Sequence, residues 1–354
     1  MKILIIGAGP TGLSAALGLA EKGIICDVVE KRDAPSALSR AVGIMPVTRN
    51  HLAPSGVAEA ILREGMPIRK FALNRGKKSL LDLDLSATLT PEQSMTALPQ
   101  NRTESLIAEA AIARGVKIKY GVALTQIETT GQAATVTFAD GSRATYDWVI
   151  ASDGKNSVVR TQLGIPYPGI DLPETWSIAD VDVAEGFDSE QIKLWVQGVD
   201  GIFILAIPIE HQRMRMASCT EDCMRDVPEK PDVRHIRRTG TFKISVRQAE
   251  TYRKGRVLLA GDAAHCHSPV GGRGMNLGID DGFAVARCLA EGTVDSYSAD
   301  RHAFGEAVIK KTERMRKMLT SQSLFNRTVL NIVTGLVGRA KRAQRMFIRA
   351  LTTF

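Results

Sequence analysis

The sequence contains few cysteines, and they follow no repeated spacing. The five are Cys26, Cys219, Cys223, Cys266 and Cys288. An even, regularly spaced set would indicate a disulfide framework, and two Cys-x-x-Cys pairs would indicate zinc. His265 and His267 flank Cys266, but no third ligand is evident, so no metal is expected. Scattered free thiols are typical of a reducing compartment, which predicts a cytoplasmic protein.

Long apolar runs are also missing. No stretch of about 18 apolar residues follows the N-terminus, so we expect no transmembrane helix. The first residues, MKILIIGAGPTGLSAALGLA, do combine a lysine, an apolar run and small residues, as a secretory signal would. Glycines interrupt this run at positions 7, 9 and 12, which favours a buried strand, a tight turn and a helix instead.

Acidic residues are scarce at the C-terminal end. The chain of 354 residues has a net charge of +8, but residues 301–354 alone contain twelve Lys/Arg and two Asp/Glu, which leaves −2 for residues 1–300. The basic character is therefore local and excludes a general nucleic-acid-binding role.

The same basic tail has helical periodicity. Apolar residues recur from 325 to 350, with Arg342, Arg345 and Arg349 on the other side, while Gly335 and Gly338 weaken the pattern and allow a break into two helices. A basic amphipathic segment of this kind can pack on its own protein, form a homodimer contact or lie on an anionic membrane. The sequence leaves these three alternatives open.

The strongest motif is Gly7-Ala8-Gly9-Pro10-Thr11-Gly12, between a predicted strand at 2–6 and a predicted helix at 12–22. In such a turn the first glycine permits the tight bend, the second lets a pyrophosphate approach the backbone, and the third lets the helix pack on the strand. A second strand at 24–29 ends at Glu30, where a carboxylate accepts hydrogen bonds from an adenosine ribose. The pattern predicts a dinucleotide site.

Local signals indicate further elements. Residues 103–114 predict a helix, with Thr103 as a candidate cap, and Asp140-Gly141 predicts a hairpin turn. Segments between 174 and 220 are β-rich without intervening helices, which predicts an antiparallel sheet. We expect an α/β fold: a Rossmann-like subdomain from residues 1–72, 97–170 and 250–300, an inserted β-rich substrate subdomain from 73–96 and 171–249, and a helical basic segment at 301–354.

Two more segments narrow the class of nucleotide. One is DWVIASDG at 147–154, followed by KNSVVR; the other is GRVLLAGDAAH at 255–265, followed by PVGGRGMN at 269–276. With the glycine turn, they make the chain resemble the single-component FAD-dependent aromatic hydroxylases, the flavoprotein monooxygenase family of para-hydroxybenzoate hydroxylase and the phenol hydroxylases. The resemblance covers about residues 1–300.

The resemblance implies an FAD site. Asp262 would bind the ribityl chain, the loop 269–276 would surround the isoalloxazine ring, Gln100 would contact the flavin, and Arg40 and Pro269 would lie near the ring. The implied cofactor-binding residues are Gly7, Gly9, Pro10, Thr11, Gly12, Glu30, Lys31, Arg32, Arg40, Gln100, Asp153, Gly154, Gly261, Asp262, Pro269, Gly272, Gly274, Met275 and Asn276. Catalysis would be centred on the flavin, without an assigned catalytic side chain.

The implied reaction is hydroxylation of a small aromatic, phenol-like substrate by O2 through a peroxyflavin, with NADH or NADPH as reductant. No second GxGxxG unit follows residue 100, so no separate nicotinamide domain is expected. Alternatives are another FAD enzyme of the same fold, either an isoprenoid-chain reductase or a halogenase, and a non-enzymatic flavin-binding module. The segment 203–208, FILAIP, lacks the tryptophans of the halogenase W-x-W-x-I-P run.

The substrate pocket is expected between the loop 269–276 and the β-rich insertion. Its candidate wall residues are Trp195, Phe203 and Arg215, with Trp176, His211 and Arg213 as further candidates. No sequence motif indicates the identity of the substrate, the position hydroxylated or the choice between NADH and NADPH.

Overall fold

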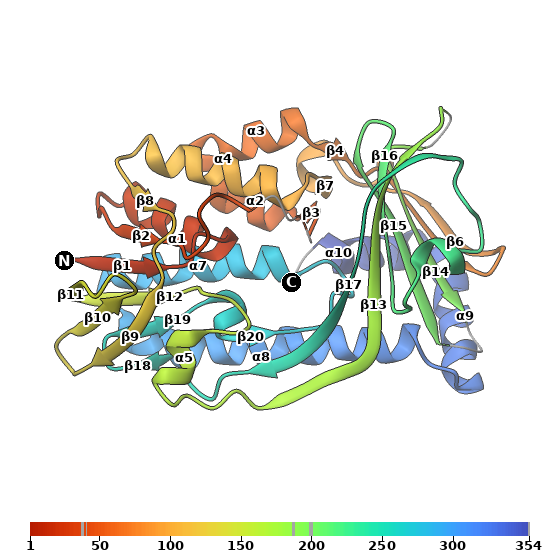
Figure 1. Cartoon of the computed structure of the whole chain (residues 1–354). Coiled ribbons are helices and arrows are strands. Elements are labelled where there is room, and N and C mark those ends of the chain that lie inside the picture. The colour runs from red at the N-terminus through yellow and green to blue at the C-terminus, as the bar shows by residue number, and fades with distance from the viewer. Residues whose placement is uncertain (37–38, 40, 186–187, 198–200, 353–354) are drawn as a thin grey trace.

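The computed structural model describes residues 1–36, 39, 41–185, 188–197 and 201–352, and only the backbone of residues 197, 351 and 352. Figure 1 shows two sheets beside each other, with the long helices α7 (Gly274–Glu291) and α8 (Val294–Leu319) running along them. The chain crosses between the two sheets several times, so each sheet is assembled from separated stretches of sequence.

Six of the described strands form a mostly parallel sheet. Their order is β18 (Arg253–Lys254), β19 (Val257–Leu259), β12 (Trp148–Ala151), β1 (Ile3–Ile6), β2 (Asp27–Val29) and β8 (Lys117–Lys119). The runs ILII of β1 and WVIA of β12 are buried along their whole length, as expected for parallel strands that are covered on both faces. β1 lies between β12 and β2 and pairs in parallel with both.

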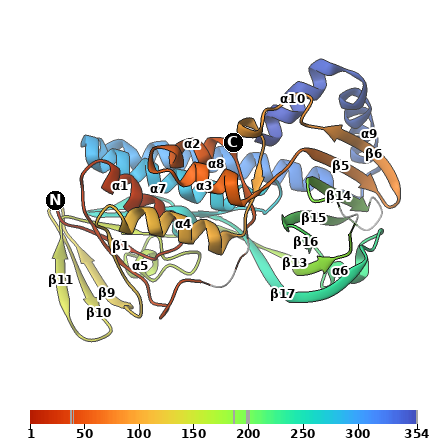
Figure 2. The same ribbon diagram turned by 90° about the horizontal axis from the view of Figure 1, so that it is seen from above.

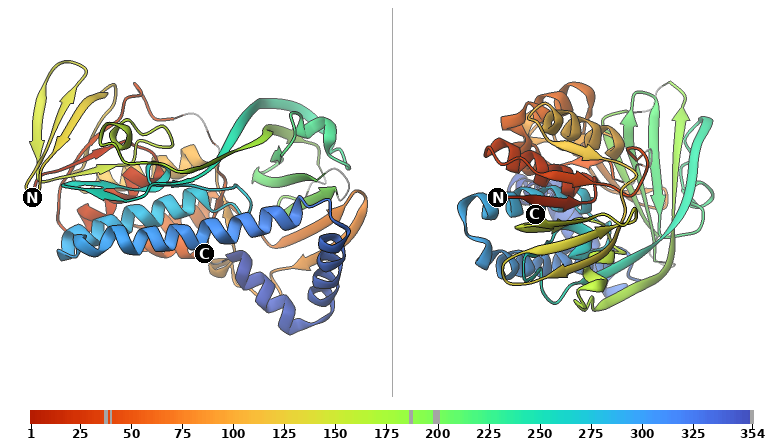
Figure 3. Two further views of the ribbon diagram at one scale, coloured as in Figure 1. Left: turned by 90° about the horizontal axis from the view of Figure 1, so that it is seen from below. Right: turned by 60° about the vertical axis from the view of Figure 1, so that its left-hand side comes forward.

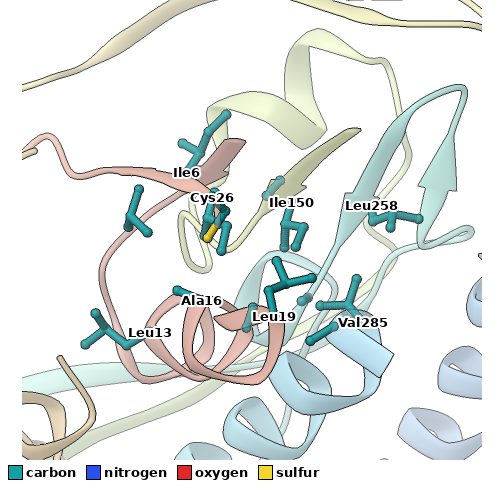
Figure 4. Close-up of a cluster of buried hydrophobic side chains, with 14 of the residues drawn as sticks. Ile6, Leu13, Ala16, Leu19, Cys26, Ile150, Leu258 and Val285 are labelled. Carbon is teal, nitrogen blue, oxygen red and sulfur yellow. The ribbon is translucent and has the colours of Figure 1, made fainter. Parts of the chain in front are cut away.

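Helix α1 (Pro10–Glu21) packs on this sheet together with α7, and Figure 4 shows the apolar side chains that fill the space between them. The two helices approach closely because glycines face the contact. A Cβ on Gly282 would lie 2.5 Å from the carbonyl oxygen of Thr11, and one on Gly18 would lie 3.0 Å from the side chain of Ala286. This close packing positions the N-terminal ends of both helices at the same edge of the sheet.

A second sheet contains eight of the described strands. Their order is β20 (His265–Cys266), β17 (Val233–Gln248), β13 (Gly169–Val183), β16 (Arg213–Ser218), β15 (Ile202–Glu210), β14 (Gln191–Gln197), β5 (Lys70–Arg75) and β6 (Lys78–Asp84). The predicted antiparallel arrangement is confirmed for the strands between β13 and β14, but β5 pairs in parallel with β14.

Alternation along the strands gives this sheet two apolar faces. The inner face, with Trp176, Phe203 and Ile207, packs against the tail helices and against Val270. The outer face, with Trp195 and Ile204, packs against the short helix α6 (Cys223–Asp226). Any site between the two subdomains can therefore draw side chains only from the inner face.

The other elements lie around these two sheets and include two small three-stranded sheets, β11-β10-β9 and β3-β7-β4; Figures 1 and 2 show where many of them lie. Helices α2 (Pro46–Leu52), α3 (Val57–Glu64) and α4 (Gln100–Ile112) lie beside α1 and α7. The tail continues after α8 as α9 (Leu324–Arg339) and α10 (Lys341–Thr352). The remaining elements are β3 (Gly43–Ile44), β4 (Met66–Pro67), β7 (Thr96–Ala97), β9 (Leu124–Thr129), β10 (Ala134–Phe138), β11 (Arg143–Tyr146), α5 (Val158–Gln162), η1 (Ala53–Ser55), η2 (Pro91–Gln93) and η3 (Gly261–Ala263).

Two local predictions differ from the structure. Thr103 is not a cap, because α4 begins at Gln100 and the Thr103 hydroxyl donates to the carbonyl oxygen of Pro99 inside the first turn. The tail does divide into two helices, but the break falls at Ala340, whose backbone is extended, and both Gly335 and Gly338 lie within α9. The hairpin turn at Asp140-Gly141 is confirmed, with Gly141 at φ +82°.

Candidate functional site

Three turns from distant parts of the sequence pack against one another at one edge of the parallel sheet. A Cβ on Gly7 would lie 2.5 Å from the carbonyl oxygen of Ser152 and 3.2 Å from the Cα of Asp153. A Cβ on Gly261 would lie 2.3 Å from the hydroxyl oxygen of Thr11. The structure therefore brings the glycine turn, the Asp153-Gly154 turn and the Gly261-Asp262 turn together, at the place where nucleotides bind in this architecture.

Gly9 and Gly12 serve different purposes at the start of α1. A Cβ on Gly12 would lie 1.9 Å from the carbonyl oxygen of Gly7, so this glycine is required for packing. Gly9 has an ordinary φ of −83°, and a Cβ there would meet nothing within 4 Å. The first N–H groups of a helix have no intrahelical acceptor, so open space at this end suits a pyrophosphate.

Glu30 lies at the end of β2, beside this helix end. Its carboxylate accepts a hydrogen bond from the backbone N–H of Ala8 at 2.9 Å, and from the backbone and side chain of Arg32 at 3.0 Å each. Burial disfavours the charged form, but the hydrogen bonds from Arg32 and Ala8 outweigh it, so the pKa of Glu30 is lowered. Glu30 is thus an ionised acceptor of the kind that a ribose requires. Lys31 is exposed to solvent.

The turn at Gly261-Asp262 depends on a buried carboxylate that the sequence analysis missed. Asp281, in α7, accepts the backbone N–H of Gly261 at 2.9 Å, contacts His265 Nε2 at 2.6 Å, and accepts from Arg301 Nε at 2.7 Å. Burial raises its pKa, but His265 and Arg301 bring it well below its usual range. The adjacent Asp280 and Asp281, which are the only charged residues between 274 and 286, were the available signal for this role.

The loop 269–276 contains both exposed and buried residues. Pro269, Gly272 and Gly274 are exposed, whereas Met275 and Asn276 are buried. The side chain of Asn276 is fully used within the protein. Its oxygen accepts from the backbone N–H of Met45 and from the Thr48 hydroxyl at 2.8 Å each, and its nitrogen donates to the carbonyl oxygens of Gly43 and Gly272. Asn276 therefore positions this loop.

The side chains of Gln100 and Asp153 also contact the protein itself. Gln100 accepts the backbone N–H of Ala41 at 3.1 Å, donates to Glu104 at 2.7 Å, and its backbone N–H donates to the Ser39 hydroxyl. Asp153 accepts the backbone N–H of Val158 at 2.8 Å through Oδ2, while its buried Oδ1 has no hydrogen-bond partner among the described residues. Arg40 lies outside the described residues.

The candidate substrate residues separate onto the two faces of the large sheet. Phe203 lies on the inner face, with its ring 5.9 Å from that of Trp176. Arg215 is buried and pairs with both carboxylate oxygens of Asp180, at 2.7 and 2.8 Å, and also contacts the Ser39 hydroxyl at 3.3 Å. Arg215 therefore joins the sheet to the segment that contacts Gln100.

Three other candidates lie elsewhere. The structure places Trp195 on the outer face, in the cluster with α6, because its neighbours Leu194 and Val196 take the inner face. His211 is exposed in the β15–β16 turn, and Arg213 forms ion pairs with Asp182 and Glu210.

A polar cleft of about 330 Å³ lies next to Gly154. The hydroxyl of Tyr167, in its wall, donates to the carbonyl oxygen of Asp262 at 3.0 Å, and Arg160 donates to that of Ala263 at 2.8 Å. The cleft thus adjoins both aspartate turns. Three cations outnumber one carboxylate among its lining residues, which are Lys155, Asn156, Arg160, Tyr167, Asp171, Ser245 and Arg247.

These features fit FAD. Open space at Gly9 suits the pyrophosphate, ionised Glu30 suits the ribose, the exposed Asp262 suits the ribityl chain, and the exposed backbone of Gly272 and Gly274 suits a flat ring.

Comparison with known proteins agrees with this geometry. The model of the family described as "FAD binding domain" matches residues 1–222 and 210–312. Rifampicin monooxygenase of Streptomyces venezuelae is 31% identical over 345 residues, covering 90% of this chain and 72% of that protein. Pentachlorophenol 4-monooxygenase of Sphingobium chlorophenolicum is 27% identical, covering 90% of this chain and 64% of that protein. The crystal structure of p-nitrophenol 4-monooxygenase from Pseudomonas putida shares the fold, with a TM-score of 0.87, 22% identity, and coverage of 99% of this chain and 98% of that chain.

The chain belongs to the FAD binding domain family. Within that family it is a flavoprotein monooxygenase, with FAD as cofactor and NAD(P)H as co-substrate. Among the described residues, no helix has both the length and the apolarity needed to cross a membrane.

Proposed function

We propose that this flavoprotein hydroxylates a small aromatic, phenol-like substrate, using NADH or NADPH and O2. The observation that carries the proposal is the meeting of the three turns at Gly7, Asp153 and Gly261 around one helix end, with the loop 269–276 facing the inner apolar face of the large sheet. The names of two similar proteins, pentachlorophenol 4-monooxygenase and p-nitrophenol 4-monooxygenase, support a phenol as substrate.

FAD, when bound, supplies the two-electron chemistry by which a reductant and O2 are brought to react. The chain itself binds and orients the cofactor. The N-terminal N–H groups of α1 would face the pyrophosphate, Glu30 would accept from the ribose, and the exposed backbone of the loop 269–276 would donate to the ring. Asp281 and Asn276 hold the Gly261-Asp262 turn and the loop 269–276 in place for these contacts.

Water must be kept from the reacting atoms, and the inner face provides an apolar wall for that purpose. Its side chains include Trp176, Phe203 and Ile207. Val270 of the loop 269–276, which we call the flavin loop, packs in the same cluster. We place the aromatic substrate against this cluster. The buried pair of Arg215 and Asp180 supplies polar atoms beside it, which suits orientation of a phenolic hydroxyl.

The polar cleft is our proposed site for the phosphates of NAD(P)H. Its excess of positive charge, from Lys155, Arg160 and Arg247 against Asp171, supports this assignment. Replacement of Lys155 with alanine is expected to raise KM for NAD(P)H by about tenfold while FAD binding stays unchanged. Lys243→Ala is the matched control, because Lys243 is an exposed lysine of β17 that does not line the cleft.

The decisive experiment is to purify the protein with FAD and screen phenols for stimulated NAD(P)H oxidation. The proposal predicts that one compound raises the rate and gives a product heavier by one oxygen atom. A product isomeric with the substrate, or a halogenated product, would contradict it. NAD(P)H oxidation that no aromatic compound stimulates would contradict it as well.

We further propose that the enzyme acts in the cytoplasm. All five cysteines are free thiols, and Cys26, Cys223 and Cys266 are buried without a partner cysteine. Unpaired thiols persist where the compartment is reducing, which is also where NAD(P)H is available.

A further inference from the structure

Exposed large apolar side chains are concentrated on the helices α9 and α10. Of the thirteen large apolar side chains that are exposed among the described residues, six lie between Leu324 and Met346. The left view of Figure 3 shows α9 at the end of α8 and α10 turning back from it, with the β5–β6 hairpin nearby. An exposed concentration of this kind on a folded protein marks a contact surface.

Helix α9 has two distinct apolar sides. One side, with Leu330 and Val337, is buried against the body of the protein. The other side presents Phe325, Ile332 and Leu336, which are 74%, 57% and 57% exposed. Positions seven and four residues apart lie on one side of a helix, so these three side chains form a continuous stripe that nothing in the described chain covers.

Basic residues accompany this stripe, and acidic residues do not. From Arg314 to the end of the sequence there are nine Lys/Arg and no Asp or Glu. Helix α10, which follows α9 after one residue, exposes Lys341, Arg342 and Arg345 while it buries Ile348. We call the exposed stripe of α9 and these three basic residues the tail surface.

We propose that the tail surface docks this enzyme on the surface of an anionic lipid bilayer. Apolar side chains beside Lys and Arg are the combination that inserts into the boundary of lipid headgroups and acyl chains. Each basic residue near an anionic leaflet adds electrostatic attraction, and from Arg314 onward the sequence contains no acidic residue to oppose it. Contact is peripheral, since none of the described helices can cross a membrane.

A second copy of the chain is the less suitable occupant. A symmetric dimer contact would place the same patch of positive charge against itself, with no Asp or Glu in α9 or α10 of either copy to compensate. A nucleic acid would satisfy the charges, but it would leave Phe325, Ile332 and Leu336 exposed to water. The bilayer is the partner that matches both properties of the surface.

Docking would bring the bilayer close to the reaction site. Arg273, in the flavin loop, donates to the carbonyl oxygen of Ala350 in α10 at 2.9 Å. The ring of Phe347 lies 5.8 Å from that of Phe71, inside the inner-face cluster that also contains Val270. We infer that the substrate is an aromatic compound that partitions into lipid. This second step rests on the proposed function, whereas docking itself does not.

The test is co-sedimentation of the FAD-loaded protein with vesicles of phosphatidylcholine alone or with roughly one third phosphatidylserine. The wild type should bind the anionic vesicles, and binding should weaken at high salt. R342E/R345E should lose more than about tenfold in affinity. F325S/I332S keeps the charge but should lose binding as well. K117E/K119E reverses two exposed lysines of β8, at the edge of the other sheet, and should bind like the wild type.

Several results would overturn the proposal. One is equal binding to neutral and anionic vesicles, and another is no binding to either kind of vesicle. A third is a loss of affinity in K117E/K119E as large as that in R342E/R345E. Light scattering that shows a dimer dissociated by F325S/I332S would assign the surface to a second copy. Binding to DNA that R342E/R345E abolishes and F325S/I332S leaves intact would assign it to a polyanion. The visible flavin spectrum of each variant checks that it is folded. R342K/R345K, which keeps both positive charges, is the conservative exchange. Turnover of a water-soluble phenol by R342E/R345E separates failure of docking from failure of the proposed function.

Discussion

The backbone N–H of Gly261 donates a hydrogen bond to the buried carboxylate of Asp281, twenty residues later in the chain. The same carboxylate contacts His265 and Arg301, so one side chain connects the Gly261-Asp262 turn to α7 and α8. We regard Asp281 as a positioning residue for FAD, because it fixes the backbone from which Asp262 projects.

Replacement of Asp281 with asparagine should destabilise the protein by about 3 kcal/mol and weaken FAD binding. The exchange removes the charge that compensates buried Arg301, and loss of one partner of a buried pair costs about that much. Urea denaturation and fluorescence titration of FAD measure the two effects. Asp280→Asn is the control: Asp280 is more exposed and pairs with His51 and Arg301. Equal effects of the two exchanges would contradict the role of Asp281.

Gly9→Ala and Gly12→Ala should separate cofactor binding from folding. Gly9 has room and an ordinary φ, so alanine should leave stability nearly unchanged but weaken FAD binding by roughly tenfold or more, because a methyl group would occupy the proposed path of the pyrophosphate. At Gly12 the methyl group would collide with the Gly7 carbonyl, with an expected cost of about 3 kcal/mol. Thermal melts of the apoprotein and FAD titrations distinguish the two. The idea fails if Gly9→Ala binds FAD like the wild type.

The buried pair of Arg215 and Asp180 should contribute to substrate binding separately from its contribution to stability. Arg215→Met alone leaves the Asp180 carboxylate buried and unpaired, which is expected to cost about 3 kcal/mol. The double exchange R215M/D180L should recover most of that stability, since an apolar pair can replace a buried ion pair. KM for the aromatic substrate should stay raised in the double variant.

Trp195→Phe is the matched control for substrate binding, because Trp195 lies on the outer face of the same sheet. It should leave KM within about twofold of the wild type. If Trp195→Phe raised KM as much as R215M/D180L does, the assignment of the inner face to substrate would be wrong.

Acid should destabilise the protein through His267. Burial lowers the pKa of His267 from its ordinary value of 6.5 to about 4. As pH falls through 6.5 the unfolded chain takes up a proton that the folded chain does not, so stability decreases until about pH 4, by about 3 kcal/mol in all. Unfolding by urea at pH 7 and pH 4.5 measures the change. His267→Gln should remove most of this slope, and an unchanged slope would refute the assignment.

Much of the site was readable from the sequence because local spacing specifies it. Gly7, Gly9 and Gly12 must lie between a strand and a helix to serve a phosphate, and that order is visible in the letters. Buried parallel strands such as ILII and WVIA are equally local, since their apolar runs need no partner to be recognised. Even Glu30 follows from its place at the end of a strand.

The sequence by itself determined which segments form the turns of the proposed cofactor site, because strand–turn–helix motifs encode their own backbone geometry. Only the tertiary structure decided which side chains serve that site from elsewhere. Asp281 contacts Gly261 because α7 packs against the Gly261-Asp262 turn. Asn276 contacts Met45 across more than two hundred residues, and Trp195 faces away from the site because of strand register. Such pairings depend on the packing of distant segments, which no local pattern records.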